Sequence, residues 1–551
     1  MSFKLSMVIL TRKGYSFLFL WTKQGNRHFK SMCFLEYLGY NKNMRKILKV
    51  LTSRLFIVAP LVILQFAFFV MLFYSVAYTE RLLPFLSLLS IIFCIYVINQ
   101  KEDPSYKIAW IIVILAAPVI GIPLYVLAGN RHVPKKLYNG TVRATDQMDD
   151  LLLKSVNIDD CDDVDGGAKK MFRYGRNRVG FPVYQHTKSE YYCSGEEWFP
   201  HYLEALRQAK HFIFIETFII DQGSMWNEVL TILKDKVKEG VEVKIIYDDF
   251  GSITLPHHYS RYLRELGIEA HRFNHVRARF IIQMNNRDHR KITVIDNQVA
   301  FTGGVNFADE YVNRIERFGY WKDSAIRIEG EAVWSFTVMF LGLLSYVRSK
   351  NEPVVEYDKY RIHYSVEGDG GYYQPWADTP TDKESVALNM HVHMVKHARD
   401  YIYIDTPYLI LNETMKQELI LAAKSGVDVR ILTPHIPDKK LVFQITRGFY
   451  RELIDGGVKI YEFSPGFNHT KNFVSDDNIA IVGSANTDYR SYFLHFENGC
   501  LMYKTSEIMK IKQNFLDAIE KSHEVTIEDT EKVFVLVRIV RAVLNLFIPL
   551  L

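Results

Sequence analysis

Cysteine is scarce in this sequence, and the few cysteines are scattered along it. There are five in 551 residues, an odd number without a Cys-x-x-Cys pair. Disulfide-stapled domains depend on paired, closely spaced cysteines, so this pattern argues against a disulfide framework. A chain of this length can bury a core without covalent cross-links. The composition therefore indicates two or three domains in a reducing compartment.

Charge of one sign is also scarce. The net charge is only +5, which does not argue for nucleic acid, and we expect no nucleic-acid partner. The positive charge is concentrated at one end, because residues 1–54 carry eleven Lys or Arg and a single acid, Glu36. A basic segment ahead of apolar segments is a topology signal and a possible contact for anionic lipid headgroups.

Three apolar runs follow the basic segment. Residues 55–78, 82–98 and 108–128 contain 24, 17 and 21 residues without a charge. A bilayer is spanned by about 20 apolar residues, so these runs predict a transmembrane helical region over residues 55–128. The basic region is too long for a secretory signal peptide and no small-residue cleavage site follows it. We therefore expect a multi-pass protein of the cell membrane.

Charged residues also bear on the position of the initiator methionine and on the membrane topology. Met44 precedes a basic stretch that looks like a natural N-terminus, and we expect it to be the initiator. The basic N-terminus and the cluster at Arg131, Lys135 and Lys136 both favour the cytoplasmic side. Two cytoplasmic ends need an even number of spans, so either one run re-enters or lies in the interface, or the charge signal misleads. We favour two full spans and a cytoplasmic catalytic region.

Both ends of the remaining chain differ in composition from its middle. Residues 129–180 include a stretch rich in Asp and are predicted to be a solvated linker. Residues 525–551 end in an apolar segment whose polar residues, Arg538, Arg541 and Asn545, share one helical face. Two arginines make a spanning helix costly, so this segment predicts an amphipathic, membrane-associated helix.

Two copies of one short pattern organise the middle of the chain. The first is His289-Arg290-Lys291 with Asp296, and the second is His469-Thr470-Lys471 with Asp476. Each copy is followed by a glycine-containing stretch, and every element recurs 180 residues later. A lone His-x-Lys is more often an ordinary surface strand, but two chance copies in one register are improbable. We interpret them as two halves of one active site.

The repeat extends beyond these motifs. Residues 209–217 are echoed by 398–406, residues 240–245 by 426–431, and residues 263–273 by 453–463. The offset shrinks from 190 to 180 at the motif, which places about ten extra residues just before His289. Strand and helix patterns alternate in each half, which indicates an α/β layer architecture. The predicted halves are residues 181–365 and 366–524, related by a pseudo-two-fold axis.

The residue types suit phosphodiester chemistry. An imidazole can attack phosphorus to form a phosphohistidine, while a second imidazole transfers protons. Two lysines can neutralise the phosphate oxygens, so we expect no metal and no other cofactor. The two aspartates would anchor the motifs, since a carboxylate would repel the substrate. The predicted catalytic residues are His289, Lys291, Asp296, His469, Lys471 and Asp476. The predicted phosphate-binding residues are Gly303, Gly304, Asn306, Gly483, Ser484 and Asn486.

The two His-x-Lys-x4-Asp motifs resemble those of the phospholipase D superfamily, over about residues 181–520. Residues 483–491, together with Ala109-Trp110 and Pro118-Val119-Ile120-Gly121, are similar to bacterial cardiolipin synthases in particular. The resemblance implies two phospholipase D-like α/β sandwich halves after a transmembrane region. It also implies that an acidic residue of each half orients the histidine of the other, so His469 is expected to pair with Asp323 and His289 with Glu497.

The resemblance implies an activity as well. Two molecules of phosphatidylglycerol would give cardiolipin and glycerol, and superfamily habit favours His289 as the attacking residue. The expected partners are phosphatidylglycerol, other anionic lipids and the membrane, while the oligomeric state is left open. The alternatives are a phospholipase D hydrolase or a phosphatidylserine synthase with the same chemistry, a nuclease of the same superfamily, and a non-catalytic membrane scaffold. The apolar runs argue against a nuclease, and the two intact motifs argue against a scaffold.

Overall fold

The computed structural model describes most of the chain. The described residues are 5–12, 15–22, 32–33, 76–129, 151–152, 155–275, 286–348, 352–364, 366–382 and 384–548. Met44 and nearly all of the apolar run at residues 55–78 lie outside them, as do the roughly ten extra residues expected just before His289. The chain forms a smaller N-terminal unit and a larger unit that contains both motifs, and each is described by itself.

The N-terminal elements are a small antiparallel sheet and a set of helices. The strands are β1 (Leu5–Arg12), β2 (Tyr15–Thr22) and β3 (Met32–Cys33), and the helices are α4 (Val76–Ile98), α5 (Pro104–Ala116), α6 (Pro118–Leu124) and η1 (Tyr125–Gly129). In the smaller unit α4 packs against α6, and the ring of Tyr125 meets Tyr96 and Trp110 edge-on. None of the described helices is both long and apolar enough to cross a bilayer.

The run at residues 108–128 is not one continuous helix. It divides at Ala117, which has an extended φ of −145°, and α6 begins with Pro118 as its first residue. Proline lacks the backbone N–H that a continuing helix needs, and it disfavours a helical conformation in the residue before it. A second proline, Pro123, lies inside α6. The sequence was expected to form a single segment here, and the prolines explain the difference.

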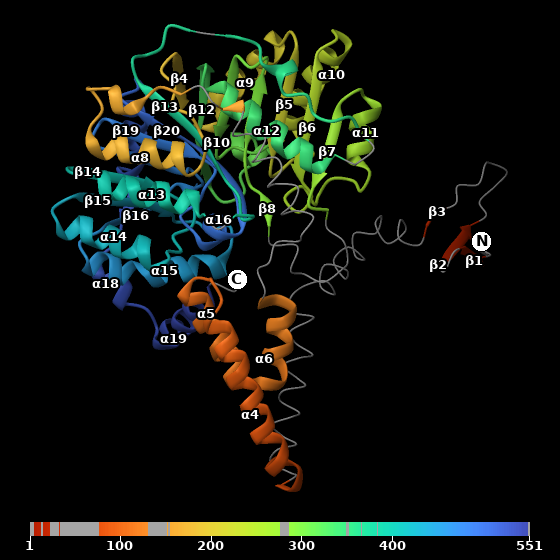
Figure 1. Ribbon diagram of the computed structural model, residues 1–551, viewed down its shortest axis with the longest axis vertical. Coiled ribbons are helices and arrows are strands. Elements are labelled where there is room, and N and C mark those ends of the chain that lie inside the picture. Colours follow the sequence, from red (N-terminus) through yellow and green to blue (C-terminus); the bar gives the residue numbers. More distant parts are fainter. Residues whose placement is uncertain are drawn as a thin grey trace. The chain divides into compact units, whose positions relative to one another are not determined.

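The larger unit contains two halves of matching topology (Figure 1). The strand order is β4-β12-β10-β9-β5-β6-β7 in the first half and β13-β20-β19-β18-β14-β15-β16-β21 in the second. In both, three parallel strands join an antiparallel set through the strand that follows the motif histidine. The α/β fold with two repeated halves, predicted from the sequence, is confirmed.

The elements of the first half alternate as the hydrophobic pattern indicates. They are β4 (Thr187–Tyr192), α9 (Gly195–Gln208), β5 (Phe212–Thr217), α10 (Ser224–Lys238), β6 (Glu242–Asp248), α11 (Tyr259–Glu265), β7 (Glu269–Phe273), β8 (Arg287–Asp288), β9 (Ile292–Ile295), β10 (Val299–Gly303), η4 (Asp309–Val312), β11 (Tyr320–Lys322), β12 (Ala325–Gly330), α12 (Val333–Val347) and η5 (Asp358–Tyr360). All six residues of β5 are buried, as expected of a strand covered on both faces.

The second half repeats this order. Its elements are β13 (Tyr372–Asp378), α13 (Val386–His397), β14 (Tyr401–Asp405), α14 (Glu413–Lys424), β15 (Asp428–Pro434), α15 (Lys440–Asp455), β16 (Lys459–Phe463), β17 (Gly466–Asn468), β18 (Asn472–Ser475), β19 (Ile479–Gly483), α16 (Tyr489–Phe493), β20 (His495–Tyr503), α17 (Ile508–Ile519), β21 (Ser522–Glu524), α18 (Ile527–Glu531) and α19 (Val535–Phe547).

Residues 155–180, which the sequence assigns to a linker, belong to the core of the second half. After η2 (Ile158–Asp160) they form α8 (Gly166–Asn177), drawn in orange-yellow beside β13 and β20 in Figure 1. Asp165 caps α8 by accepting from the backbone N–H groups of Gly167 and Ala168, and it also lies 3.0 Å from the ring of His397. Met171 and Phe172 are fully buried. The aspartates that resemble a solvated linker therefore cap and anchor a packed helix.

Two short parallel strand pairs join the halves. β8, just before His289, pairs with β20 of the second half, and β17, just before His469, pairs with β11 of the first half. Helix α17 also reaches across, because Asn514 donates to the hydroxyl of Tyr191 on β4 at 2.8 Å. Each motif histidine thus emerges from a segment that is hydrogen-bonded to the opposite half.

Candidate active site

Each motif histidine is positioned by a backbone hydrogen bond across the pseudo-two-fold axis. The N–H of His289 donates to the carbonyl oxygen of Phe496 at 2.9 Å, and the N–H of His469 donates to that of Lys322 at 2.7 Å. Both side chains are buried, with 7 % of each residue exposed. The residue that directly follows each acceptor is an acid, Glu497 after Phe496 and Asp323 after Lys322. The same pairing therefore places a carboxylate beside each ring.

The two histidine–carboxylate pairs expected from the sequence are present. Nδ1 of His289 lies 3.0 and 3.1 Å from the carboxylate oxygens of Glu497, and Nδ1 of His469 lies 2.6 Å from Asp323. A carboxylate accepts hydrogen bonds, so Nδ1 carries the proton in both rings and Nε2 is the basic nitrogen. Each half therefore supplies a histidine and the acid that orients the other histidine.

The lysines stand beside their histidines and are fully enclosed. The ammonium groups of Lys291 and Lys471 donate to the carbonyl oxygens of His289 and His469. Burial lowers the pKa of Lys291 to about 7 and the pKa of Lys471 to about 8, although nearby carboxylates act in the opposite direction. The ammonium charge is therefore held in a setting where a phosphate anion would stabilise it.

Burial also governs the titration of the histidines. It is the largest cause that lowers the pKa of His289 to about 3, with Lys291 adding to the shift and Glu497 opposing it. Burial likewise lowers the pKa of His469 to about 4, followed by the charge on Lys471. Both imidazoles are neutral at physiological pH in the free protein. The neutral form is the one that can attack phosphorus.

The carboxylate of Glu497 stays ionised despite its burial. Burial raises its pKa, but the charge interaction and hydrogen bonds with His289, together with the nearby ring of His495, outweigh this, so the pKa lies well below its usual range. A permanent negative charge next to Nδ1 stabilises the ring when it becomes cationic. This is the charge that a phosphorylated or protonated imidazole would need.

The motif aspartates anchor the chain away from the histidines. Asp296 accepts from three successive backbone N–H groups, those of Lys210, His211 and Phe212, at 2.7–2.8 Å. Asp476 accepts from the three equivalent groups at the start of β14, at 2.8–3.0 Å. Both aspartates have a positive φ of 52° in the turn between two strands. They tie that turn to the neighbouring strand, as expected from the sequence.

The glycine-containing stretches have a structural role that the sequence did not indicate. The N–H groups of Gly304 and Ser484 donate to Ser324 and Asn498, so they are occupied within the sheets. A Cβ on Gly304 would lie 1.9 Å from Oδ1 of Asp323. Ser484 donates to Glu497 at 2.5 Å. Position 304 makes room for one orienting carboxylate, and position 484 holds the other; Gly303 and Gly483 let the neighbouring strand approach.

The two motif asparagines are also engaged within the chain. Asn306 accepts from the N–H of Ile219 and donates to the hydroxyl of Tyr311, at 3.0 and 2.8 Å. Asn486 donates to Asp488 at 3.1 Å, while its side-chain oxygen has no hydrogen-bond partner among the described residues. Asn306 therefore orders its loop instead of presenting a free donor to a phosphate.

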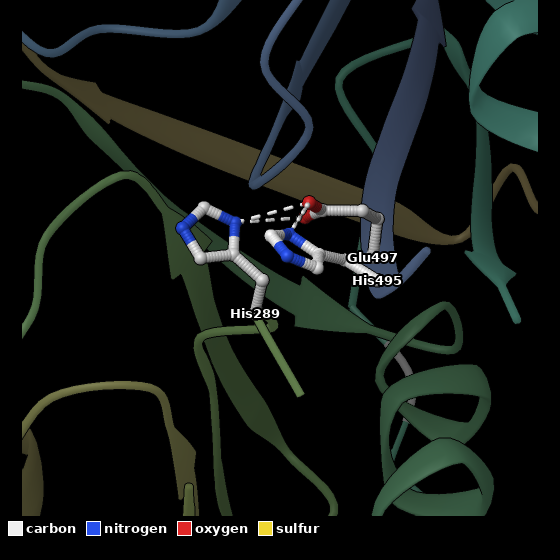
Figure 2. Close-up of side chains that lie close together, drawn as sticks. All are labelled: His289, His495 and Glu497. Atoms are coloured by element: carbon white, nitrogen blue, oxygen red, sulfur yellow. Dashed lines mark hydrogen bonds and ion pairs between the residues drawn. The ribbon is translucent and has the colours of Figure 1, made fainter. Parts of the chain in front are cut away.

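His495 is part of the site and was missed by the sequence reasoning. Figure 2 shows its ring beside that of His289, with Glu497 reached by both; the ring centroids are 5.5 Å apart and Nδ1 lies 3.6 Å from Glu497. At the matching place of the other half, Trp321 lies 5.2 Å from His469. Both residues precede the orienting acid by two positions. An alignment of the two halves therefore places His495 and Trp321 at the same position, and this is the sequence signal that could have identified His495.

The same three side chains carry atoms that could act as ligands of a metal ion. The ligand atoms of His289, His495 and Glu497 lie within 4.8 Å of one another. Glu497 already accepts from His289 and Ser484, and the ammonium of Lys291 interacts with it. A cation would have to displace these donors next to a fixed positive charge, so we interpret the group as a proton-sharing cluster.

The fold and the paired His-Lys sets define a phospholipase D-type enzyme. A search of solved structures supports the fold: phosphatidylserine synthase of Haemophilus influenzae superposes with a TM-score of 0.53 at 16% identity, covering 69% of this chain and 99% of that one. Residues 202–324 and 392–519 match the family described as "Cardiolipin synthase, PLD-like domain". Residues 86–130 match the phospholipase D-nuclease N-terminal family.

Curated relatives narrow the class. A cardiolipin synthase of Geobacillus sp. is 34% identical over 485 residues, covering 86% of this chain and 95% of the relative. That of Alkalihalophilus pseudofirmus is 33% identical over 444 residues, covering 79% and 87%. An uncharacterised protein of Streptococcus mutans is 40% identical over 464 residues, covering 83% and 99%. The chain belongs to the cardiolipin synthase family, whose members are phosphatidyltransferases of the phospholipase D type.

Proposed function

We propose that this protein joins two phosphatidylglycerol molecules into cardiolipin and glycerol through a phosphohistidine intermediate. The observation that carries the proposal is the pair of buried histidines, each with its own lysine and each oriented by a carboxylate of the opposite half. Membership of the cardiolipin synthase family supports the choice of lipid. No cofactor is needed, because the lysines supply the positive charge at phosphorus.

Attack is assigned to His289 and proton transfer to His469. His495 stands beside His289 and opposes a second positive charge there, whereas the matching neighbour of His469 is the indole of Trp321. This asymmetry favours a neutral, attacking ring at position 289. The superfamily resemblance of the motifs points to the same residue.

The reaction then runs in two displacements. The phosphate anion of the bound lipid favours the protonated form of His469, which takes up a proton at Nε2. Nε2 of His289 then attacks phosphorus of the first lipid, and the departing glycerol oxygen takes that proton from His469. Glu497 balances the positive charge of the phosphorylated ring. His469 next removes the proton from a glycerol hydroxyl of the second phosphatidylglycerol, whose oxygen attacks phosphorus and frees His289. Lys291 and Lys471 stabilise the charge on the phosphate oxygens in both steps.

We also propose that the protein is a multi-pass membrane protein whose catalytic unit faces the cytoplasm. The apolar runs and the basic N-terminal segment support this placement. The C-terminal helix α19 supports contact between the catalytic unit and lipid. Its polar side faces the protein, because Arg541 donates to Gln444 of α15 at 3.0 Å and Asn545 packs against Gly448.

The apolar side of α19 is exposed instead of buried. Six large apolar side chains on this side are 38–65 % exposed: Val535, Leu536, Ile539, Val540, Val543 and Leu546. In a water-facing helix the apolar side would pack on the core and the polar side would be exposed. The inverted arrangement, with Arg538 beside the apolar surface, suits a helix lying in the plane of an anionic membrane.

Purified protein incubated in detergent with phosphatidylglycerol tests the reaction. We expect cardiolipin and free glycerol in equal amounts, measured by mass spectrometry of the extracted lipids. Phosphatidic acid with glycerol would mean that water is the acceptor and that the protein is a hydrolase. Addition of serine or another alcohol with a different lipid product would indicate another acceptor, and no turnover would favour a scaffold.

A further inference from the structure

A cavity separate from the histidine motifs lies in the first half, beside α11 and β7. Its volume is about 320 Å³. Three arginines and four histidines line most of it: Arg261, Arg264, Arg272, His257, His258, His271 and His275. None of them belongs to the histidine motifs. The cavity therefore has a lining suited to a negatively charged ligand.

The positive charge of this lining is not balanced by acids. The guanidinium of Arg264 is hydrogen-bonded to a neutral group. Its Nε and Nη2 both donate to the carbonyl oxygen of Ala270, at 3.0 and 2.8 Å. Asp249 is shared between lining residues, accepting from His275 at 2.7 Å and from Arg272 at 3.3 Å. Arg261 forms no ion pair within the described part of the chain. The lining residue His271 lies 2.9 Å from Glu269, but that carboxylate also pairs with Lys244 and Arg348. Among the described residues, the positive groups of the lining therefore outnumber the carboxylates that face them.

The histidines crowd the same space. The ring centroid of His257 lies 6.2 Å from that of His258 and 6.2 Å from that of His275. Burial lowers the pKa of His257, and the charges on Arg272 and His275 lower it further. The protonated form of His257 is disfavoured in part because these nearby positive charges make the local electrostatic potential positive. A bound anion would remove that unfavourable energy.

We propose that this cavity binds a phosphate-bearing anion. Arginine forks and protonated imidazoles donate charge-assisted hydrogen bonds to phosphate oxygens, and the volume admits a phosphate with an attached glycerol-sized group. The cavity is connected to the active site through a single loop: Asp249 is followed by Phe250, whose ring lies 5.1 Å from the guanidinium of Arg287 on β8, two residues before His289. The ligand comes either from a lipid headgroup or from a free phosphate compound.

Equilibrium dialysis of the full chain in detergent against radiolabelled inorganic phosphate tests the site without any turnover. The variant is Arg261→Gln with Arg264→Gln. The control removes the same charge from exposed residues of the same half, Arg207→Gln with Lys238→Gln, whose side chains are 54 % and 73 % exposed. We expect the variant to lose one class of phosphate site, with affinity weakened about tenfold or more, while the control keeps it.

The two sources are separated by native mass spectrometry of the same proteins after exposure to phosphatidylglycerol. If the variant retains fewer lipid molecules than the control, the ligand is a lipid headgroup. If lipid retention is equal and only phosphate binding falls, the ligand is a free phosphate compound. Equal phosphate binding by variant and wild type, or an equal loss in variant and control, would overturn the proposal. Because these experiments measure binding, their outcome tests the anion site independently of phosphatidyl transfer.

Discussion

Each motif histidine is fixed at Nδ1, which leaves Nε2 as the nitrogen that can react. The carboxylate partner comes from the other half in both cases, Glu497 for His289 and Asp323 for His469. Neither half contains both a motif histidine and the carboxylate that orients it, so the chemistry requires both halves. The residues that differ between the halves, above all His495 and Trp321, give the two histidines different surroundings.

The lysines predict how activity responds to alkaline pH. The pKa values of about 7 for Lys291 and about 8 for Lys471 belong to the free protein, and kcat/KM reports ionisations of the free protein. An ammonium is needed at the phosphate, so kcat/KM should fall as pH rises through this range. Lys291→Arg keeps its charge at all these pH values and should move the decline to higher pH, whatever its effect on the plateau. An unchanged profile would contradict the role of Lys291.

The position of His495 beside His289 predicts a change in the acidic limb of the pH profile of kcat/KM. Burial is the main cause that lowers the pKa of His289, and the charge of His495 adds to it. Its loss in His495→Asn should let His289 take up a proton at higher pH, which removes the attacking form. The acidic limb of kcat/KM should therefore shift to higher pH, with the alkaline limb unchanged. His523→Asn, at an exposed histidine, is the control and should leave both limbs in place.

At the scale of single elements, α19 turns its polar side, and not its apolar side, toward the catalytic unit. It meets α15 through its polar side and through Leu544 and Ile548, which pack with Ile445. Its opposite side carries six exposed apolar side chains. Sequence periodicity correctly predicted an amphipathic helix, but only the structure shows which of its two sides meets the protein.

A fluorescent probe at Val540→Cys should report contact between α19 and lipid. In the full chain reconstituted into vesicles containing phosphatidylglycerol, we expect strong quenching by lipids with a nitroxide on the acyl chain. The matched position is Leu421→Cys on α14, which is 60 % exposed and equally apolar, and the wild-type chain gives the background from native cysteines. If both positions are quenched alike, or only by a water-soluble quencher, α19 does not lie in the membrane.

At the scale of the whole molecule, the internal repeat made the fold predictable. Two motifs in one register and three further echoes required two similar halves, and the structure has matching strand orders. The carboxylate partners were reached through resemblance, since spacing within one half does not reveal a contact across the axis. His495 escaped notice because its counterpart is a tryptophan, so no repeated residue type marks the position.

Other differences have local physical reasons. The aspartates near residue 160 match the composition of a solvated linker, yet Asp165 caps α8 and pairs with His397. The glycines after each motif are predicted to let the backbone approach a phosphate, and in the structure they also make room for a neighbouring strand or carboxylate. The type of a residue shows which interactions it can make. Which partner it contacts depends on chain segments that are distant in sequence.

The covalent intermediate is the central claim, and trapping it is the most direct measurement. Protein mixed with phosphatidylglycerol is quenched in alkaline denaturant, because phosphorus–nitrogen bonds of phosphohistidine hydrolyse in acid, and its peptides are analysed by mass spectrometry. We expect a phosphatidyl group on His289 in the wild type, an adduct on the same residue that forms and disappears more slowly in His469→Ala, and none in His289→Ala. A phosphatidyl group on His469 alone, or cardiolipin formation by His289→Ala, would contradict the account.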